Sequence, residues 1–97
     1  MMNEKNNFLL DKLTVAYVLY NPPLEVEKKI KLFLEKNIDV YVFENSKSNL
    51  NLKDKNLYIL GNQTNLGLGV ALKKIEIKAS ENFKEFIFYL DQDTHIT

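Results

Sequence analysis

The sequence predicts an α/β fold with three layers, built on a four-stranded and mostly parallel sheet. Three observations lead to this prediction: short apolar runs rich in β-branched and aromatic residues, amphipathic segments between them, and turn-forming residues at their junctions. Strands that are apolar on both sides are typical of a parallel sheet covered by helices on both faces. The 97 residues are enough for one domain and too few for two.

The first half of the chain contains two predicted strands with one helix between them. Residues 1–12 are mostly polar and are expected to be a loose lead-in to the domain. Leu13 to Tyr20 (LTVAYVLY) is predicted to be a buried strand, which ends at Asn21-Pro22-Pro23 because two consecutive prolines cannot continue a sheet ladder. Leu24 to Lys36 is predicted to be a helix with one apolar stripe, and Asp39 to Phe43 (DVYVF) the second strand.

The second half repeats this alternation after a polar, lysine-rich loop from Ser46 to Asn56. Leu57 to Leu60 is expected to form the third strand, Leu68 to Ser80 the second helix, and Phe86 to Leu90 (FIFYL) a fourth buried strand. The crossovers between parallel strands are expected to be right-handed. The expected strand order is 3-2-1-4, in which the first and fourth strands are central neighbours. Ligands bind to such sheets beyond the carboxyl ends of the strands, where the chain direction switches.

Composition and charge exclude several classes of function. Thirteen basic residues, all of them lysine, balance thirteen acidic residues. A neutral chain without arginine lacks the long-range field and the bidentate side chains used to bind nucleic acid, so no nucleic-acid partner is expected. The chain has no cysteine, hence no disulfide and no thiolate metal site. No signal peptide and no run long enough to cross a bilayer is apparent, so a cytoplasmic location is expected.

Two carboxylates follow the fourth predicted strand. Asp91 and Asp93 are separated by one residue, so their side chains project in the same direction if the chain stays extended. Hard cations such as Mg²⁺ or Mn²⁺ prefer carboxylate oxygens, and a cation held here would neutralise a nucleotide diphosphate. The alternative is a solvated turn in which Asp93 caps the residues that follow. The position at the end of a central strand favours the metal site.

Polar residues near the ends of the other strands are candidates for contact with a nucleoside. Glu44 and Asn45 could bond to a base or ribose, and a simple turn explains them equally well. Tyr20 could stack on a base or belong to the rim of the core. The loop from Asn65 to Gly69 precedes a helix, as phosphate-binding loops do. It lacks the third glycine of a dinucleotide fingerprint and the Gly-Lys-Ser/Thr of a P-loop, which favours a simple helix entry.

The remaining basic residues need no ligand. His95 is the only histidine, so no histidine-based metal site or catalytic triad can be assembled. Several lysines of the two predicted helices are expected on solvated helix faces: Lys28, Lys29, Lys31, Lys73, Lys74 and Lys78.

In their order and spacing, these segments resemble the family 2 glycosyltransferases with the GT-A fold. The resemblance covers Leu13 to Thr94 and rests on VAYVLYNPP at the first strand, VYVFENS at the second, NQTNLGLGVA into the second helix and FIFYLDQDT at the end. The LDQDT ending looks like that of bacterial rhamnosyltransferase-type members. The resemblance implies a Rossmann-like half that binds a nucleoside-diphosphate sugar, with Mg²⁺ or Mn²⁺ bridging protein and diphosphate.

The resemblance also implies roles for individual residues. The residues expected to contact the donor nucleotide are Tyr20, Asn21, Glu44, Asn45, Asn65, Gly67 and Asp91, and the metal is expected on Asp91 and Asp93. Two departures stand out. Glu44 is one carbon longer than the aspartate that commonly contacts the nucleoside. Members often show Ala-x-Asn-x-Gly early in the second helix, where this chain has Ala71, Lys73 and Ile75.

Length separates this chain from the family. Such enzymes usually continue for well over another hundred residues, which supply the saccharide acceptor site and the general base. Residues 13–97 are therefore expected to be a truncated GT-A-type domain that binds a nucleotide sugar weakly and does not transfer sugar unaided. No catalytic residue is assigned, and a saccharide acceptor is expected only where the missing half is present.

Two other functions compete with this interpretation. The first is a non-catalytic α/β interaction module, for which an unpaired edge of the fourth strand would allow self-association. The second is a phosphatase of the haloacid-dehalogenase type, which also places Asp-x-Asp after a buried strand. In that class the motif lies near the N-terminus and is followed by threonine at the place held here by His95, so this interpretation ranks last.

Overall fold

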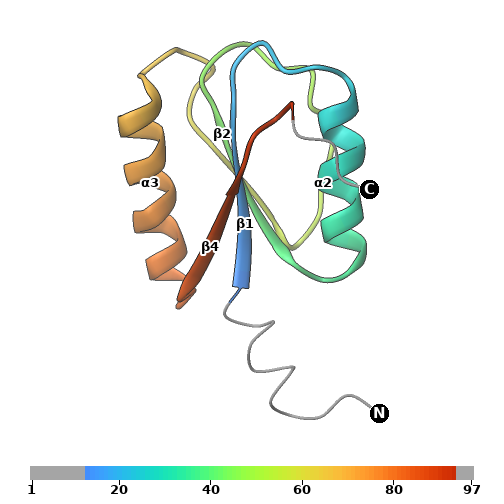
Figure 1. Cartoon of the computed structure of the whole chain (residues 1–97), viewed down its shortest axis with the longest axis vertical. Coiled ribbons are helices and arrows are strands. Elements are labelled where there is room, and N and C mark those ends of the chain that lie inside the picture. Colours follow the sequence, from blue (N-terminus) through green and yellow to red (C-terminus); the bar gives the residue numbers. More distant parts are fainter. Residues whose placement is uncertain (1–12, 94–97) are drawn as a thin grey trace.

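In a computed structural model, the described residues 13–93 form four strands and two helices (Figure 1). In chain order these are β1 (Leu13–Leu19), α2 (Glu25–Glu35), β2 (Asp39–Glu44), β3 (Leu57–Leu60), α3 (Leu68–Glu81) and β4 (Phe86–Leu90). All paired strands run parallel in the order β3-β2-β1-β4, which confirms the predicted fold class and strand order. The predictions for residues 1–12 and for His95 lie outside the described residues.

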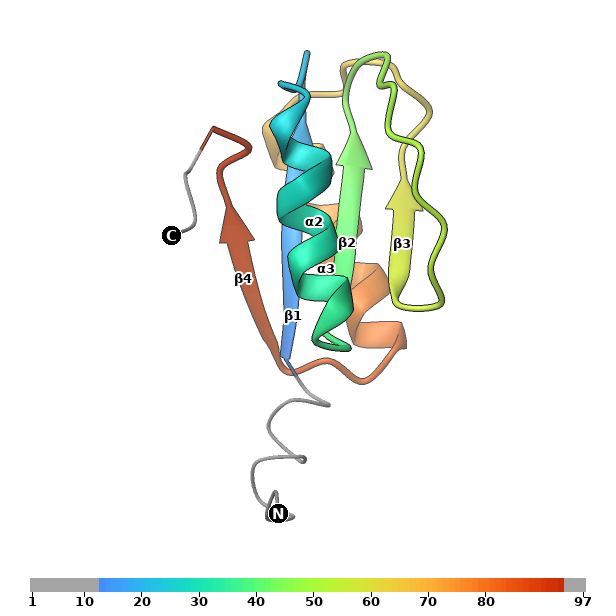
Figure 2. The same ribbon diagram turned by 90° about the vertical axis from the view of Figure 1, so that its right-hand side faces the viewer.

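The two helices cover opposite faces of the sheet and produce three layers (Figures 1 and 2). On the α2 face the buried core consists of Val15, Tyr17, Leu19, Val26, Ile30, Leu34, Val40 and Val42. On the α3 face it consists of Ala16, Tyr41, Phe43, Ala71, Ile75 and Ala79. Successive residues of β1 and β2 alternate between these two cores because strand side chains point alternately to opposite faces. This is why both strands read as continuous apolar runs.

The fourth strand is less buried than the sequence predicts. Among residues 13–93, β4 pairs only with β1 and is therefore an edge strand of the four-stranded sheet. Figure 2 shows α2 in front of β1 and β2, with β4 beside it. Phe86 and Phe88 are consequently 51% and 60% exposed, and Tyr89 is 42% exposed. The prediction of a buried fourth strand is therefore wrong, whereas its position next to β1 and its edge, unpaired within the described part of the chain, agree with the predicted order.

The α2 helix ends in a tight turn at Asn37. Asn37 adopts a left-handed backbone conformation with φ of 59°. Its N–H donates to the carbonyl oxygen of Leu34, and the N–H of Ile38 donates to that of Phe33. These bonds satisfy carbonyl groups that the last helical turn leaves free, and they direct the chain into β2. Among residues 13–93, no helix is long and apolar enough to cross a membrane.

Candidate functional site

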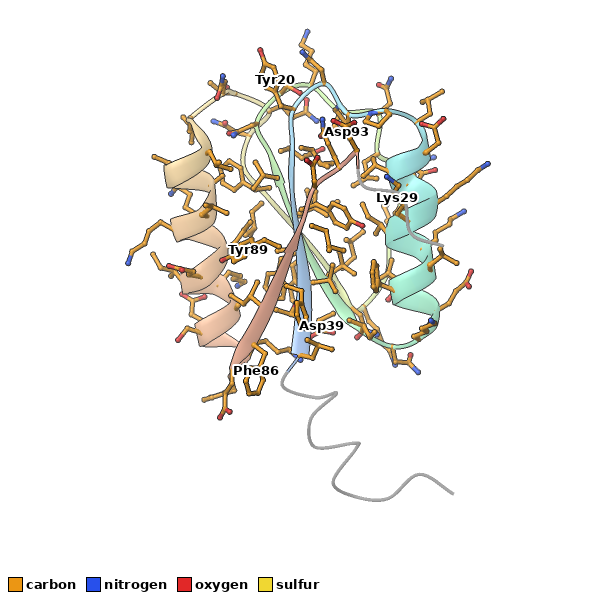
Figure 3. The ribbon with its side chains drawn as sticks, viewed as in Figure 1. Tyr20, Lys29, Asp39, Phe86, Tyr89 and Asp93 are labelled. Atoms are coloured by element: carbon orange, nitrogen blue, oxygen red, sulfur yellow. The ribbon has the colours of Figure 1, made fainter. Side chains whose placement is uncertain are left out.

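The predicted site residues lie at one edge of the sheet, at the carboxyl ends of the strands. Glu44 is the last residue of β2, and the others lie in the turns and loops that follow the strands. Hydrogen bonds join these turns into one network. The turn after β1 bonds to the turn after β4 through Tyr20 and Gln92, and to the turn after β2 through Asn21 and Ser46. The turn after β2 bonds to the loop before α3 through Asn45. Figure 3 shows Tyr20 and Asp93 at this edge, with Asp39 and Phe86 at the opposite end of the sheet.

The Asp91-Gln92-Asp93 segment forms a turn after β4. The N–H of Asp93 donates to Oδ1 of Asp91 at 3.0 Å, so the first aspartate caps the turn with its own side chain. The other oxygen of Asp91 and both carboxylate oxygens of Asp93 have no hydrogen-bond partner among residues 13–93. Both residues are exposed. Their remaining oxygens are thus accessible to a ligand from solvent.

The fit of this turn to a divalent cation is partial. Among residues 13–93 there is no group of three or more histidine, cysteine, aspartate or glutamate side chains that could hold a metal ion. Two carboxylates alone match the way Mg²⁺ is commonly bound, with water and substrate phosphate oxygens completing an octahedron. The residues present therefore suit a cation that arrives with a phosphorylated ligand better than one held by protein alone.

Gln92 and Lys29 are two residues whose roles the sequence analysis missed. The N–H of Tyr20 donates to Oε1 of Gln92 at 3.0 Å, and Nε2 of Gln92 donates to the carbonyl oxygen of Tyr20 at 2.8 Å. Nζ of Lys29 donates to the backbone oxygen of Gln92 at 2.9 Å. Lys29 is only 8% exposed, so the prediction of a solvated lysine is wrong at this position. Figure 3 shows it extending from α2 near the turn.

Asn45 holds the loop before α3 against the end of β2. The residue is 4% exposed. Its Oδ1 accepts a hydrogen bond from the N–H of Leu66 at 3.1 Å, and its Nδ2 donates to the carbonyl oxygen of Gly67 at 3.4 Å. Its backbone N–H donates to the carbonyl oxygen of Leu19. The buried amide is therefore occupied by protein groups, and a contact between Asn45 and a nucleoside stays a prediction.

The loop itself is shaped by Asn65, Gly67 and Gly61. Oδ1 of Asn65 accepts a hydrogen bond from the N–H of Gly67 at 2.9 Å, which closes a second turn capped by a side chain. Gly67 is the N-cap of α3, and no side chain caps this helix end. Gly61, directly after β3, packs against the backbone of Glu44. Glu44 itself is 8% exposed, whereas Tyr20 is 52% exposed and presents much of its ring to solvent.

Two open cavities flank the network. One of about 400 Å³ lies beside Asp91 and Gln92 on the α3 face. Its other walls are apolar or aromatic: Ala16, Val18, Leu68, Leu72, Tyr89 and Leu90. Desolvation, and more weakly the Glu76 carboxylate, raise the pKa of Tyr89, so this phenol stays neutral at physiological pH. A second cavity of about 280 Å³ lies on the α2 side and includes Asn21 and Pro22 in its lining.

Comparison with protein-family models, with curated proteins and with solved structures found no match. Any functional proposal for this edge of the sheet therefore rests on the residues and their geometry.

Proposed function

We propose that the carboxyl edge of the sheet binds a nucleoside diphosphate or nucleoside-diphosphate sugar together with Mg²⁺ or Mn²⁺, as in the donor-binding half of a glycosyltransferase. The observation that carries the proposal is the accessible pair Asp91 and Asp93 at the junction of β1 and β4, where Asp91 lines a cavity of about 400 Å³. Open parallel sheets bind nucleotides at such a place. A cytoplasmic location, in keeping with the absence of cysteine, is part of this proposal.

Each predicted residue has a proposed role that follows from its chemistry. The exposed ring of Tyr20 offers a face on which a base can stack, with Asn21 beside it. Glu44 would accept hydrogen bonds from a nucleoside. Asn45 acts by holding the loop that contains Asn65 and Gly67 at the nucleoside. Bound to the two aspartates, the cation would supply charge neutralisation of the diphosphate.

The proposal concerns donor binding alone. Sugar transfer needs a general base within hydrogen-bond distance of the acceptor hydroxyl. We assign no such base and no acceptor site to residues 13–93. Transfer to a saccharide would therefore require residues in addition to these.

An NMR titration tests donor binding. Mg²⁺ and UDP, or Mg²⁺ and dTDP, are expected to shift the amide resonances of Glu44, Asn65 and Asp91. Asp93→Asn is expected to abolish the Mg²⁺-dependent part of these shifts. Asp54→Asn is the control, because it removes the same charge from another exposed aspartate, which lies in the loop before β3. A flat titration with both nucleotides, with and without Mg²⁺, would contradict the proposal.

A second candidate function is a non-catalytic interaction module, which the exposed Phe86 and Phe88 on β4 favour. An apolar edge strand without charges is prone to pair with another strand. Light scattering at rising concentration is expected to show self-association that Phe88→Lys reduces. Ile59→Lys is the control, since Ile59 is 43% exposed on β3 at the opposite edge. A monomeric mass at every concentration would argue against self-association.

A further inference from the structure

The residue between the two aspartates is anchored to two other elements of the fold. The Gln92 side chain makes a pair of hydrogen bonds with the backbone of Tyr20, with one atom accepting at 3.0 Å and the other donating at 2.8 Å. From the α2 side, Nζ of Lys29 donates to the Gln92 backbone oxygen at 2.9 Å. The turn after β4 is thus tied to the end of β1 and to α2.

The chemistry of each anchor makes it specific. A carboxamide can donate from one atom and accept at the other, so Gln92 continues the hydrogen-bond pattern of a strand after β4 has ended. A buried ammonium is unfavourable unless hydrogen-bonded. Among residues 13–93, no carboxylate forms an ion pair with Lys29, and its hydrogen bond goes to the Gln92 carbonyl. A charged donor strengthens such a bond.

We propose that Lys29 and Gln92 are positioning residues, which fix the turn so that Asp91 and Asp93 present their carboxylates together to a divalent cation and a diphosphate. This inference rests on the proposed function. Gln92 sets the turn relative to β1, and Lys29 sets it relative to α2. Groups that orient metal-binding side chains in this way typically change metal affinity by about 10- to 100-fold when they are lost.

Two variants, each with a matched control, test the proposal. Lys29→Met removes the buried ammonium, and Lys28→Met removes the same charge from the exposed neighbour on α2. Gln92→Glu replaces the donating atom with an acceptor that faces the Tyr20 carbonyl, and Gln63→Glu makes the same change at an exposed position in the loop before α3. Thermal melting first establishes that all four variants are folded.

NMR titration with UDP measures the affinity with and without Mg²⁺, and the quantity compared is the increase in affinity that Mg²⁺ produces. Lys29→Met and Gln92→Glu are each expected to reduce this gain about 10-fold or more, while both controls stay within about 2-fold of wild type. The gain is the ratio of the UDP affinities with and without Mg²⁺, so a loss of UDP affinity that does not depend on Mg²⁺ leaves it unchanged. The double variant is expected to lose less than the product of the two single losses, because both residues hold the same turn.

A ligand-free measurement separates this inference from the proposed function. Hydrogen exchange of the Tyr20 amide is expected to be slow in wild type and clearly faster in Gln92→Leu, which removes the oxygen that accepts from this N–H. Equally fast exchange in both proteins would contradict the hydrogen bond between the Tyr20 N–H and the Gln92 side chain. If Lys29→Met and Gln92→Glu keep the full Mg²⁺-dependent gain, the positioning role is wrong and nucleotide binding stands. If wild type binds no UDP, the proposed function fails and the positioning role fails with it.

Discussion

Replacing Gly61 with alanine tests how closely the chain after β3 lies against the end of β2. Gly61 has φ of +86°, and a Cβ added to it would lie 2.7 Å from the carbonyl oxygen of Glu44 and 3.2 Å from Cε1 of Phe43. Neither neighbour can move easily, since one is backbone and the other is a fully buried ring. Gly67 has nearly the same φ, +87°, yet a Cβ there meets no atom within 4 Å. Gly67→Ala is therefore a matched control with backbone strain and no overlap.

The two substitutions are expected to differ by the energy of the overlap. A side chain at such a φ costs about 1–3 kcal/mol in either variant. Inserting a methyl group against rigid, packed neighbours adds about 1–3 kcal/mol, which applies to Gly61→Ala alone. A domain of this size has a free energy of unfolding of about 5–15 kcal/mol. Gly61→Ala is therefore predicted to remove a large fraction of the stability, and Gly67→Ala a smaller one.

Urea unfolding followed by far-ultraviolet circular dichroism measures this difference. With a dependence of about 1 kcal/mol per molar urea, typical of small domains, the midpoint of Gly61→Ala should lie about 1–3 M below that of Gly67→Ala. Equal midpoints would refute the reasoning, because they would mean that the close approach to Glu44 contributes nothing.

Three further predictions concern the tyrosines with raised pKa and one largely buried ion pair. Tyr17→Phe is expected to keep or raise the melting temperature, with a gain of up to about 1 kcal/mol, because the buried Tyr17 hydroxyl has no partner among residues 13–93. Above pH 10 the free energy of unfolding is expected to fall, because desolvation raises the pKa of Tyr17, Tyr41 and Tyr89. Lys84→Met is expected to cost about 1–3 kcal/mol in urea unfolding, because its ammonium pairs with Asp39 at 2.9 Å in a mostly buried setting.

Each of the three predictions would be contradicted by a specific result. A loss of more than about 1 kcal/mol in Tyr17→Phe would mean that its hydroxyl has a favourable partner. The alkaline prediction follows because the unfolded chain releases phenol protons at lower pH than the folded chain, so constant stability from pH 8 to 11 would contradict it. Lys78→Met is the control for Lys84→Met. Lys78 pairs with Glu81 at 3.6 Å on an exposed surface. Lys78→Met is therefore expected to lower the free energy of unfolding by at most about 0.5 kcal/mol.

The strands and their order were predictable because the pattern that identifies them is local. β1 and β2 lie between both helices, so they read as continuous apolar runs. The observed order is the one expected for two βαβ-type halves that meet at the first and fourth strands. β4 carries the same kind of run, yet Phe86 and Phe88 are exposed. Burial depends on which elements cover a strand, and composition alone does not contain that information.

The site was predictable in its location and less so in its contacts. Residues at the carboxyl ends of parallel strands meet at one edge, which follows from topology alone. The missed Lys29 did have a signal, because it lies three residues after Val26 and directly before Ile30 on the buried stripe of α2. Gln92 had none, since its bonds to Tyr20 depend on the turn after β4 and join residues 72 positions apart.

The strand order also determines when the chain can complete its fold. β1 comes first in the sequence, but one of its two neighbours is β4, and the pair Leu13 and Phe86 is separated by 86 − 13 = 73 residues. Closing so long a loop precedes any gain from the pairing, and sheets dominated by distant contacts fold slowly for that reason. Until α3 and β4 have been synthesised, the core around Ala16 lacks Ala71, Ile75 and Ala79, and β1 lacks one of its two neighbouring strands. β1, the first of the four described strands to be synthesised, is therefore among the last of them to be fully buried.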